Sequence, residues 1–368
     1  MKKKNILLLT TYSNIRDGWS NISFQFRKYL NKKNYNITVV VKEEDTSNDK
    51  NIIKAFRRDS YYNQLCLIAD TTRVYNQIKD KEFDKIIVVV EPFLPIASRL
   101  KKMMNIKELI LVAHGTYGYY PFKYFPFKLF YSRFKKDINK IIVPSKFTYD
   151  KVKEWFKGEI KIINWGVDLD EFYPIKNLRK ENKSFFFIGQ LKKRKGIDLL
   201  IDSFSKLVND YPDAKLYLAG KSSKYWLDYV KEKKLDRNIK FLGKISHDDL
   251  LRYYTKSMAT VIPSRNEKYR KGLLNYFYFE GFGLIHLESN ACGTPSIGSK
   301  NTANEDAIID GFSGYLVNYE DVNDIYEKMK RVIENKEEYS KLSKNSLKYA
   351  KDNTWDKVMD RVINFIES

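Results

Sequence analysis

Short runs of apolar residues, rich in β-branched and aromatic side chains, alternate along the chain with longer stretches in which apolar residues recur every three or four positions. The short runs are typical of buried strands and the longer stretches, such as 20–33 and 147–156, of helices. Their alternation predicts an α/β fold with a parallel sheet, because parallel strands need long crossover connections. In the first half of the chain we expect strands at residues 5–9, 37–41, 86–90, 109–113, 141–143 and 160–163.

The same pattern restarts after a polar, lysine-rich segment at 176–183, with expected strands at 185–188, 216–219, 239–242 and 260–262. With 368 residues, the chain is long enough for two sizeable cores. We therefore predict two doubly wound domains, 1–178 and 179–353, followed by a C-terminal helix at 354–368. Because such sheets bind ligands at the carboxyl ends of their strands, we expect the functional site in a cleft that the two domains face.

Charge and cysteine content narrow the class of protein. Lys and Arg number 67 against 46 Asp and Glu, which gives +21 with neutral His, and the N-terminal half is the more basic. Nucleic acid, an anionic membrane and a small anionic substrate all suit this charge. Cys66 and Cys292 lie far apart without a C-x-x-C motif, so we expect no disulfide framework, no zinc site and a reducing cytoplasm. No apolar run approaches the roughly 18 residues of a membrane span, and no secretion leader is expected.

The segment 280–295 carries the most informative chemistry. Its letters E-G-F-G-L-I-H-L-E-S-N-A-C-G-T-P predict a glycine loop that feeds a helix beginning near Gly283. The first N–H groups of a helix and its positive dipole end favour an anion. Glu280 precedes this anion seat and Glu288 lies roughly 7 Å beyond it, at ~1.5 Å per residue. A bound diphosphate would have one carboxylate near each end; the alternative is a tight turn with a capping and a surface glutamate.

Here the sequence resembles a known family. The E-G-F-G-L-x-x-x-E and A-C-G-T-P letters resemble the donor-site signature of the family-4 retaining glycosyltransferases, which have the GT-B fold of two Rossmann-like domains. Other motifs agree and stand in the right order along most of the chain. They are G-Q-L-K-K-R-K-G at 189–196, F-L-G-K-I at 241–245, I-N-W-G-V-D at 163–168 followed by Phe172 and Pro174, and His114-Gly115 at a strand end.

The resemblance implies a retaining transferase of hexosyltransferase type. It would move a sugar from a nucleotide-sugar such as a UDP- or GDP-sugar to a glycan, a lipid-linked acceptor or another hydroxyl, in surface polysaccharide or glycoconjugate biosynthesis. In the family's same-face mechanism a donor phosphate oxygen takes the acceptor proton, and no cofactor or metal is implied. The family's C-terminal helix crosses back to the N-terminal domain, and we expect this for 354–368.

The resemblance also implies residue roles. Glu280 would hold hydroxyls of the donor sugar and Glu288 the ribose, while Lys195 would stabilise the charge that develops on the leaving diphosphate. His114 would contact the donor sugar or the acceptor; a structural histidine at the strand end is the alternative. The other expected donor contacts are Gly18, Gln190, Arg194, Lys244, Ile245, Phe282, Gly283 and Leu284.

Two positions depart from the family pattern, and one short motif is typical of a different glycosyltransferase fold. Gln190 stands where the family has Arg, so either Lys192 or Arg194 compensates, or diphosphate binding is weaker. Gly18 is followed by Trp19, so only one of the family's two loop glycines remains. The letters D-L-D at 168–170 spell a metal-binding motif of another glycosyltransferase fold, but their place after a glycine turn favours loop capping.

Two further segments combine aromatic and basic residues. Segment 121–136 either lies on an anionic membrane surface on the cytoplasmic side, lines a binding groove, or packs as a helix into the core with Lys and Arg reaching outward. Segment 265–279 is a longer connection than many relatives have, and we expect a loop there that shapes the choice of acceptor.

Other functions remain to be weighed against the transferase. A glycosidase would need its two carboxylates side by side, which Glu280 and Glu288 do not provide. A sugar-nucleotide epimerase or a phosphorylase would share the fold. A basic nucleic-acid-binding protein would be expected to show clustered base-stacking aromatics or a known motif rather than two α/β units, so no nucleic-acid partner is expected.

Overall fold

The computed structural model describes residues 3–15, 18–57, 64–271 and 274–368. The chain forms two compact units, each built from more than one stretch of sequence. The first consists of Met1–Asn164, Lys268–Phe277 and Val358–Ser368, and the second of Trp165–Glu267 and Tyr278–Lys357.

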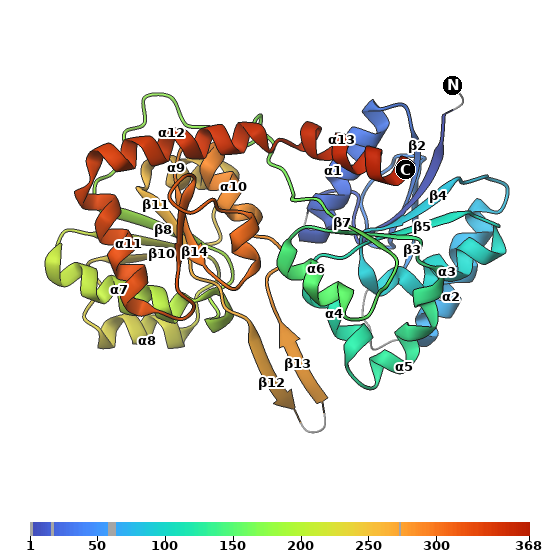
Figure 1. Ribbon diagram of the computed structural model, residues 1–368, viewed down its shortest axis with the longest axis horizontal. Coiled ribbons are helices and arrows are strands. Elements are labelled where there is room, and N and C mark those ends of the chain that lie inside the picture. The colour runs from blue at the N-terminus through green and yellow to red at the C-terminus, as the bar shows by residue number, and fades with distance from the viewer. Residues whose placement is uncertain (1–2, 16–17, 58–63, 272–273) are drawn as a thin grey trace. The chain divides into compact units, whose positions relative to one another are not determined.

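The first unit contains a seven-stranded parallel sheet with strand order β3-β2-β1-β4-β5-β6-β7 (Figure 1). Strands β4 and β6 are buried at every position, as expected for a parallel sheet covered on both faces by helices. Its strands are β1 (Asn5–Leu9), β2 (Asn36–Lys42), β3 (Ile52–Phe56), β4 (Lys85–Val88), β5 (Glu108–Val112), β6 (Lys140–Val143) and β7 (Glu159–Ile162). Its helices are α1 (Gly18–Lys32), α2 (Gln64–Ile78), η1 (Glu91–Phe93), α3 (Leu94–Met103), α4 (Thr116–Lys123), α5 (Phe127–Tyr131), η2 (Ser132–Asp137) and α6 (Lys146–Lys153).

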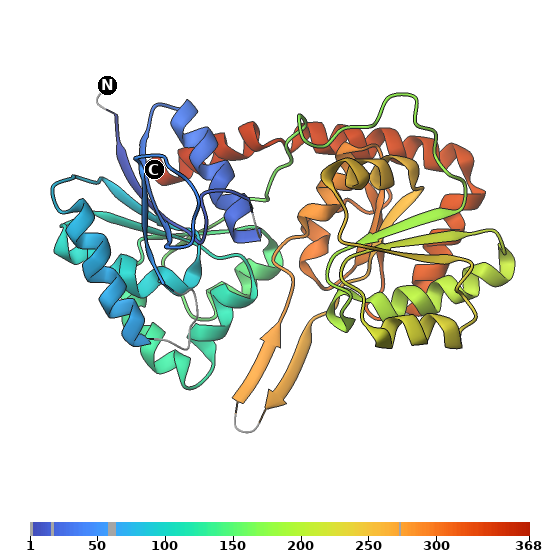
Figure 2. The same ribbon diagram turned by 180° about the vertical axis from the view of Figure 1, so that it is seen from behind.

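The second unit contains a six-stranded parallel sheet with strand order β10-β9-β8-β11-β14-β15 (Figure 2). Its strands are β8 (Ser184–Ile188), β9 (Lys215–Ala219), β10 (Ile239–Gly243), β11 (Ala259–Ile262), β14 (Ser296–Ser299) and β15 (Gly314–Val317). Its helices are η3 (Lys193–Lys195), α7 (Ile197–Asp210), α8 (Lys224–Glu232), α9 (His247–Lys256), α10 (Leu284–Ala291), η4 (Ala303–Asp306), α11 (Val322–Glu334) and α12 (Lys336–Asp352).

Every strand expected from the sequence is present, with ends that differ by no more than two residues. The sequence analysis missed β3, β14 and β15. It also expected a loop at 265–279, where the structure has a two-stranded hairpin of β12 (Glu267–Lys271) and β13 (Leu274–Tyr278). The hairpin residues 268–277 belong to the first unit.

The boundary between the units precedes the one proposed after residue 178. Residues from Trp165 onward group with the second unit, because Phe172 and Ile175 pack against its core. The N–H of Ile175 also donates to Oγ1 of Thr255 over 3.1 Å. The lysine-rich segment 176–183 therefore lies inside this unit rather than between two.

The C-terminal helix crosses back to the first unit, as the family resemblance implied. Helix α13 spans Trp355–Glu367, and its residues from Val358 onward belong to the first unit. Lys85 and Lys140, at the amino ends of β4 and β6, donate from Nζ to the carbonyl oxygens of Ile366 and Phe365 over 2.6 and 3.0 Å. Cations at the negative end of a helix stabilise it, so these lysines fasten α13 to the sheet.

Segment 121–136 does not form one helix. Helix α4 ends at Lys123, and α5 and η2 follow as separate short helices. Phe122 and Tyr131 are buried, whereas Phe125 and Leu129 are 67% and 64% exposed. No helix among the described residues is long and apolar enough to cross a bilayer.

Candidate active site

The strand order of the second unit reverses between β8 and β11, since β9 and β10 extend the sheet on one side and β14 and β15 on the other. A doubly wound sheet binds ligands at such a switch point, beyond the carboxyl ends of its strands. The loops after β8 and β11 meet there, where the N–H of Arg265 donates to the carbonyl of Arg194 over 2.8 Å. Gly196 has φ +70°, and a Cβ on it would lie 2.0 Å from the carbonyl oxygen of Pro263, so only glycine fits.

Glu280 lies between two cations from the loop after β8. Its Oε2 accepts hydrogen bonds from Nζ of Lys195 over 2.6 Å and from Nη1 of Arg194 over 2.9 Å. Burial alone would raise the pKa of Glu280, but the charges of Lys195 and Arg194 outweigh it and lower the pKa to about 2. The site therefore holds an ionised carboxylate between two cations.

Helix α10 begins directly after Gly283, whose φ of +105° few other residues adopt. A Cβ at this position would lie 2.8 Å from Cδ2 of His286 and 3.1 Å from Nδ2 of Asn304. Both side chains are buried, and Nδ1 of His286 and Nδ2 of Asn304 have no hydrogen-bond partner among the residues that the structure describes. Burial lowers the pKa of His286 to about 3, so the ring is neutral at pH 7. An amide donor and a helix N-terminus thus meet at one point, where an anion would satisfy them.

Glu288 lies about one and a half turns beyond Gly283 on α10. Its Oε2 accepts a hydrogen bond from the hydroxyl of Tyr254 over 3.0 Å. Burial raises the pKa of Glu288 to about 7, and the Tyr254 hydrogen bond offsets only part of this shift. Tyr254 itself is fully buried on α9. The carboxylate is therefore positioned by one hydroxyl and has acceptor capacity left for others.

The remaining residues expected at the donor site lie on neighbouring parts of the same unit. Gln190 and Lys244 follow β8 and β10 and are exposed, while Phe282 is buried. Ile245 is half-buried and packs against the apolar cluster that contains Tyr254. Leu284 is half-buried at the first position of α10.

His114 and Gly18 belong to the first unit. The ring of His114, which follows β5, bonds through Nε2 to the carbonyl oxygen of Val89 over 2.8 Å, so Nε2 carries the proton and Nδ1 is the acceptor. Burial lowers the pKa of His114 to about 4, so this ring is neutral at pH 7. Gly18 is exposed at the start of α1, and a Cβ there would meet nothing within 4 Å, so the fold does not require glycine at this position.

Glu91, which sequence analysis did not single out, joins these two regions of the first unit. It follows β4 at the switch point between β1 and β4 and is fully buried. Its carboxylate accepts from the N–H of His114 over 2.7 Å and from Nε1 of Trp19 over 3.0 Å. Burial raises the pKa of Glu91 to about 8, although the hydrogen bonds from these donors lower it in part.

The D-x-D letters form a turn: Oδ1 of Asp168 accepts from the N–H of Asp170 over 3.1 Å. This contact is the capping that the sequence analysis expected. Within the described ranges, no group of three or more His, Cys, Asp or Glu is placed to hold a metal ion.

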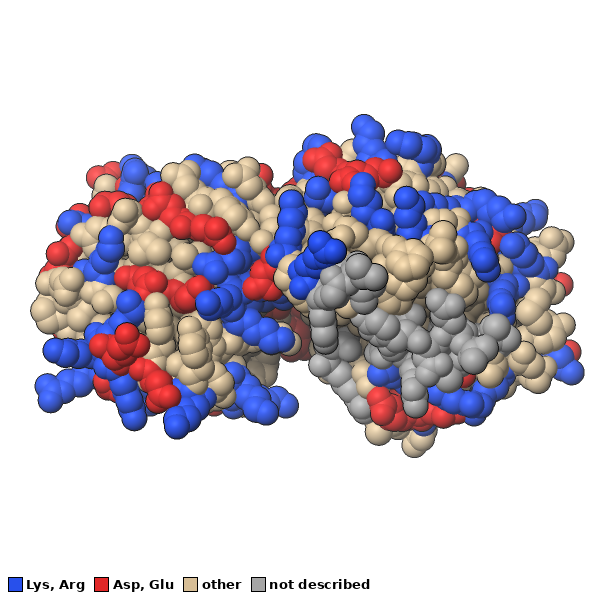
Figure 3. Space-filling model, turned by 90° about the horizontal axis from the view of Figure 1, so that it is seen from below, with Lys and Arg blue, Asp and Glu red and all other residues tan. Residues whose placement is uncertain are grey.

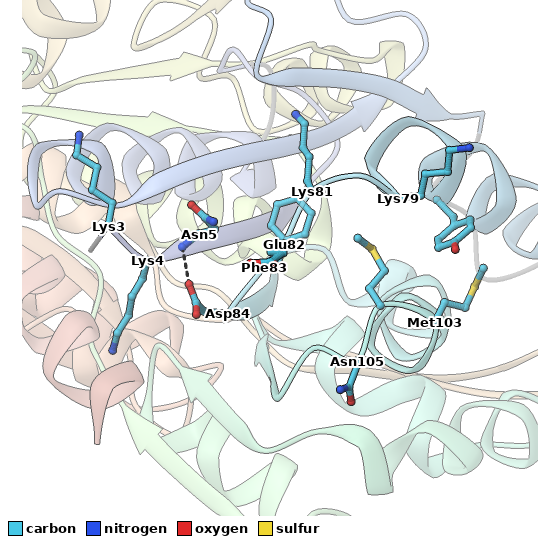
Figure 4. A pocket seen from close by; sticks show the side chains of 12 residues that line it. Lys3, Lys4, Asn5, Lys79, Lys81, Glu82, Phe83, Asp84, Met103 and Asn105 are labelled. Carbon is cyan, nitrogen blue, oxygen red and sulfur yellow. Dashed lines mark hydrogen bonds between the residues drawn. The ribbon is translucent and has the colours of Figure 1, made fainter. Parts of the chain in front are cut away.

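A cavity of about 620 Å³ lies elsewhere, at the amino ends of β1 and β4 (Figure 4). Lysines 3, 4, 79 and 81 line it, and the N–H of Asn5 donates to Asp84 at its wall over 2.7 Å. Ligands of doubly wound sheets bind at the opposite, carboxyl edge, so the geometry gives this cavity no part in the candidate site.

The sequence motifs marked Glu280, Lys195 and Arg194, which the fold brings together, but not the residues that surround them. His286 stands inside the quoted motif, yet only the fold shows that its ring and Asn304 flank Gly283. Glu91 carries no local signal, because its partner Trp19 is 72 residues away in the chain.

Comparison with known proteins identifies the family of the chain. The sequence model described as Glycosyl transferases group 1 matches residues 169–349, and the one described as Glycosyltransferase Family 4 matches residues 17–171. An uncharacterized glycosyltransferase of Methanocaldococcus jannaschii is 27% identical over 71% of this chain and 68% of its own length. Several other curated relatives are matched over about half of their length.

Solved structures share the fold across the whole chain. Sucrose-phosphate synthase from Thermosynechococcus elongatus superposes with a TM-score of 0.80 at 18% identity, covering 99% of this chain and 98% of that one. HepE of Anabaena, solved with UDP and glucose, superposes with a TM-score of 0.73 at 14% identity over 99% of both chains. With its two Rossmann-like units and with matches to both family models, the chain belongs to the family-4, or group 1, glycosyltransferases of the GT-B fold.

Proposed function

We propose that this glycosyltransferase transfers a hexose from a nucleotide-sugar to a hydroxyl acceptor with retention at the anomeric carbon. The observation that carries the proposal is the arrangement of Lys195 and Arg194 on Glu280 beside the N-terminus of α10. The two cations and the free N–H groups suit a diphosphate, and the ionised Glu280 suits the hydroxyls of the sugar attached to it.

The other expected roles follow from the same geometry. Glu288, positioned by Tyr254, would accept hydrogen bonds from the ribose hydroxyls. His114, whose ring is neutral at pH 7, would contact a hydroxyl of the donor sugar or the acceptor. Gln190 stands where the family has an arginine. Arg194, rather than the exposed Lys192, would take over the role of that arginine, because Arg194 and Lys195 both contact the same carboxylate oxygen of Glu280.

Retention fits the absence of an obvious nucleophile beside these groups in the described part of the chain. In the same-face mechanism the glycosidic bond to the diphosphate breaks, and a phosphate oxygen takes the acceptor proton as the acceptor oxygen bonds to the anomeric carbon. Lys195 and Arg194 would then stabilise the charge left on the diphosphate.

A thermal-shift screen against UDP- and GDP-sugars tests the donor class. A true donor at a hundred times its dissociation constant stabilises the protein by ~2.7 kcal/mol. Proton NMR of the product then gives its anomeric configuration. Stabilisation by none of these donors would contradict the donor class, and an inverted product would contradict the mechanism. A salt titration against duplex DNA tests the nucleic-acid alternative.

We also propose contact with the cytoplasmic face of an anionic membrane, through the exposed Phe125 and Leu129. Lys123 and Lys128 are exposed beside them. Figure 3 shows Lys and Arg side chains spread widely over one face of the protein, with Asp and Glu in smaller patches. Each cation near an anionic surface contributes about 1 kcal/mol at low salt.

Vesicle sedimentation tests this contact. We expect recovery with phosphatidylglycerol vesicles to exceed recovery with phosphatidylcholine, and the difference to fall in the double variant Phe125→Ser, Leu129→Ser. Equal recovery with both lipids would contradict the proposal.

A further inference from the structure

The hairpin β12–β13 is fastened to the first unit by aromatic stacking. Tyr276 on β13 stacks on Tyr120 of α4, with ring centroids 5.4 Å apart and planes 10° from parallel. Tyr269 on β12 stacks on Tyr276 at 4.7 Å and 9°. Phe277 packs edge-on against Tyr119 at 6.1 Å. These contacts explain why hairpin residues group with the first unit, although the second unit precedes and follows them in the chain.

A hollow of about 310 Å³ opens beside this stack. Its volume is at the lower end of the ~300–1,000 Å³ of small-molecule sites. Tyr276 is buried and Tyr269 is 47% exposed, so the hollow has an aromatic wall that begins in the core and ends in solvent. The lining residues are Tyr124, Lys268, Tyr269, Arg270, Asn275 and Tyr276.

The charged side chains among the described lining residues of the hollow are both basic. Lys268 and Arg270 are exposed on β12, and no carboxylate occurs among the lining residues that the structure describes. A guanidinium binds a carboxylate or phosphate through two parallel hydrogen bonds, and an ammonium adds a point charge. Asn275 adds an amide that both donates and accepts, which suits hydroxyl groups.

From this combination we propose that the hollow is an acceptor subsite for an acidic sugar, a saccharide that carries a carboxylate or a phosphate. The apolar face of the sugar ring would pack on the tyrosine wall, and Arg270 and Lys268 would bind the acidic group. Tyr276 precedes Glu280 by four residues, so the chain holds their Cα atoms within ~14 Å of each other. This inference rests on the proposed transferase function and specifies its acceptor.

The test measures binding of soluble monosaccharides by saturation-transfer NMR, with and without a saturating nucleoside diphosphate. Glucose 6-phosphate and glucuronic acid are the acidic probes, and glucose is the neutral one. We expect at least one acidic probe to bind at least five times more tightly than glucose, and Arg270→Gln to remove that preference. If only one of the two acids binds, that result shows whether the hollow recognises a phosphate or a carboxylate.

Two further variants separate the site from the general positive charge. Arg361→Gln removes the same charge from an exposed position on α13 in the same unit and should leave the dissociation constants unchanged. Tyr269→Ala should weaken both acidic and neutral probes, and Tyr269→Phe should restore them. Melting temperature and nucleoside diphosphate binding report that each variant is folded.

The proposal is overturned if neither acidic probe binds, if glucose binds as tightly as the acids, or if Arg361→Gln weakens binding as much as Arg270→Gln. These results are distinct from failure of the transferase assignment, which would appear as loss of nucleotide-sugar binding in the unaltered protein.

Discussion

Lys195 and Glu280 form an ion pair of 2.6 Å in which only 12% and 19% of the two side chains are exposed. They are 85 residues apart in sequence. Lys195 follows β8, and Glu280 lies between β13 and α10 in the connection from β11 to β14, so both belong to connections of the two strands at the switch point of one sheet. An ion pair this poorly hydrated has a fixed geometry, which suits a site that must hold a charged ligand in one orientation.

The first prediction concerns Gly283→Ala. Because Gly283 has φ +105°, an alanine there strains the backbone. Its methyl group would also lie 2.8 Å from Cδ2 of His286 and displace that ring. We expect a loss of about 1–3 kcal/mol in the free energy of unfolding and a marked loss of nucleoside diphosphate affinity.

Gly311→Ala is the matched control for this variant. Gly311 has φ +71°, but a Cβ there meets nothing within 4 Å, so it carries the backbone strain without the crowding. Chemical denaturation and calorimetry measure both effects. Equal diphosphate affinity in the two variants would show that the start of α10 is not the anion site.

The second prediction is a pH dependence. Because burial raises the pKa of Glu288 to about 7, the group is half protonated at neutral pH. The ionised form of Glu288 would accept hydrogen bonds from the ribose hydroxyls, so nucleotide binding must release the proton from the protonated form. As the pH increases toward 7, the affinity for the nucleoside diphosphate should therefore rise by up to tenfold per pH unit, and it should level off above about 8. Glu288→Gln should bind more weakly and lose this component, while titration of the diphosphate itself remains in both proteins. Calorimetry from pH 5.5 to 8.5 with UDP and GDP checks this, and identical slopes would exclude Glu288 from the ribose site.

The third prediction is that transferase activity survives EDTA. In the proposed site, Lys195, Arg194 and the N-terminus of α10 would supply the positive charge that a divalent cation would otherwise bring to the diphosphate. Initial rates before and after chelation test this. Complete loss that Mg²⁺ or Mn²⁺ restores would contradict it and direct attention back to Asp168 and Asp170.

The parts of the fold that the sequence predicted are those with a strong local signal. After an initial lysine, strands β4 and β6 consist of apolar residues alone, because both their faces are buried. Strand β14, with the letters S-I-G-S, is equally buried but is short and rich in small residues, so no pattern marks it. The hairpin strand β12, E-K-Y-R-K, looks like an exposed loop, since what orders the hairpin is stacking on α4.

The candidate site divides in the same way. Glu280, Glu288 and Lys195 stand out in the sequence because they belong to segments that resemble family motifs. The framework around them depends on contacts between distant segments: Tyr254 reaches Glu288 from another helix, and Glu91 accepts from Trp19 and from His114. Their importance comes from burial and hydrogen bonding, which the sequence pattern does not encode.

The last prediction is that Lys195→Ala lowers kcat far more than it raises the KM of the donor. In the proposed site the N-terminus of α10 would already bind the diphosphate in the ground state, whereas the further negative charge appears only as the sugar departs. Loss of such an interaction in a water-poor site costs ~3 kcal/mol, roughly a hundredfold in rate. Steady-state kinetics of Lys195→Ala and Arg194→Ala measure it. Arg194 contacts the same oxygen of Glu280 over 2.9 Å but is more exposed, at 24% against 12%, so we expect a smaller loss there. If Arg194→Ala were the damaging change and Lys195→Ala nearly silent, the guanidinium would be the group that stabilises the leaving diphosphate. If both were silent while Glu280→Ala was inactive, neither cation would act in the transition state.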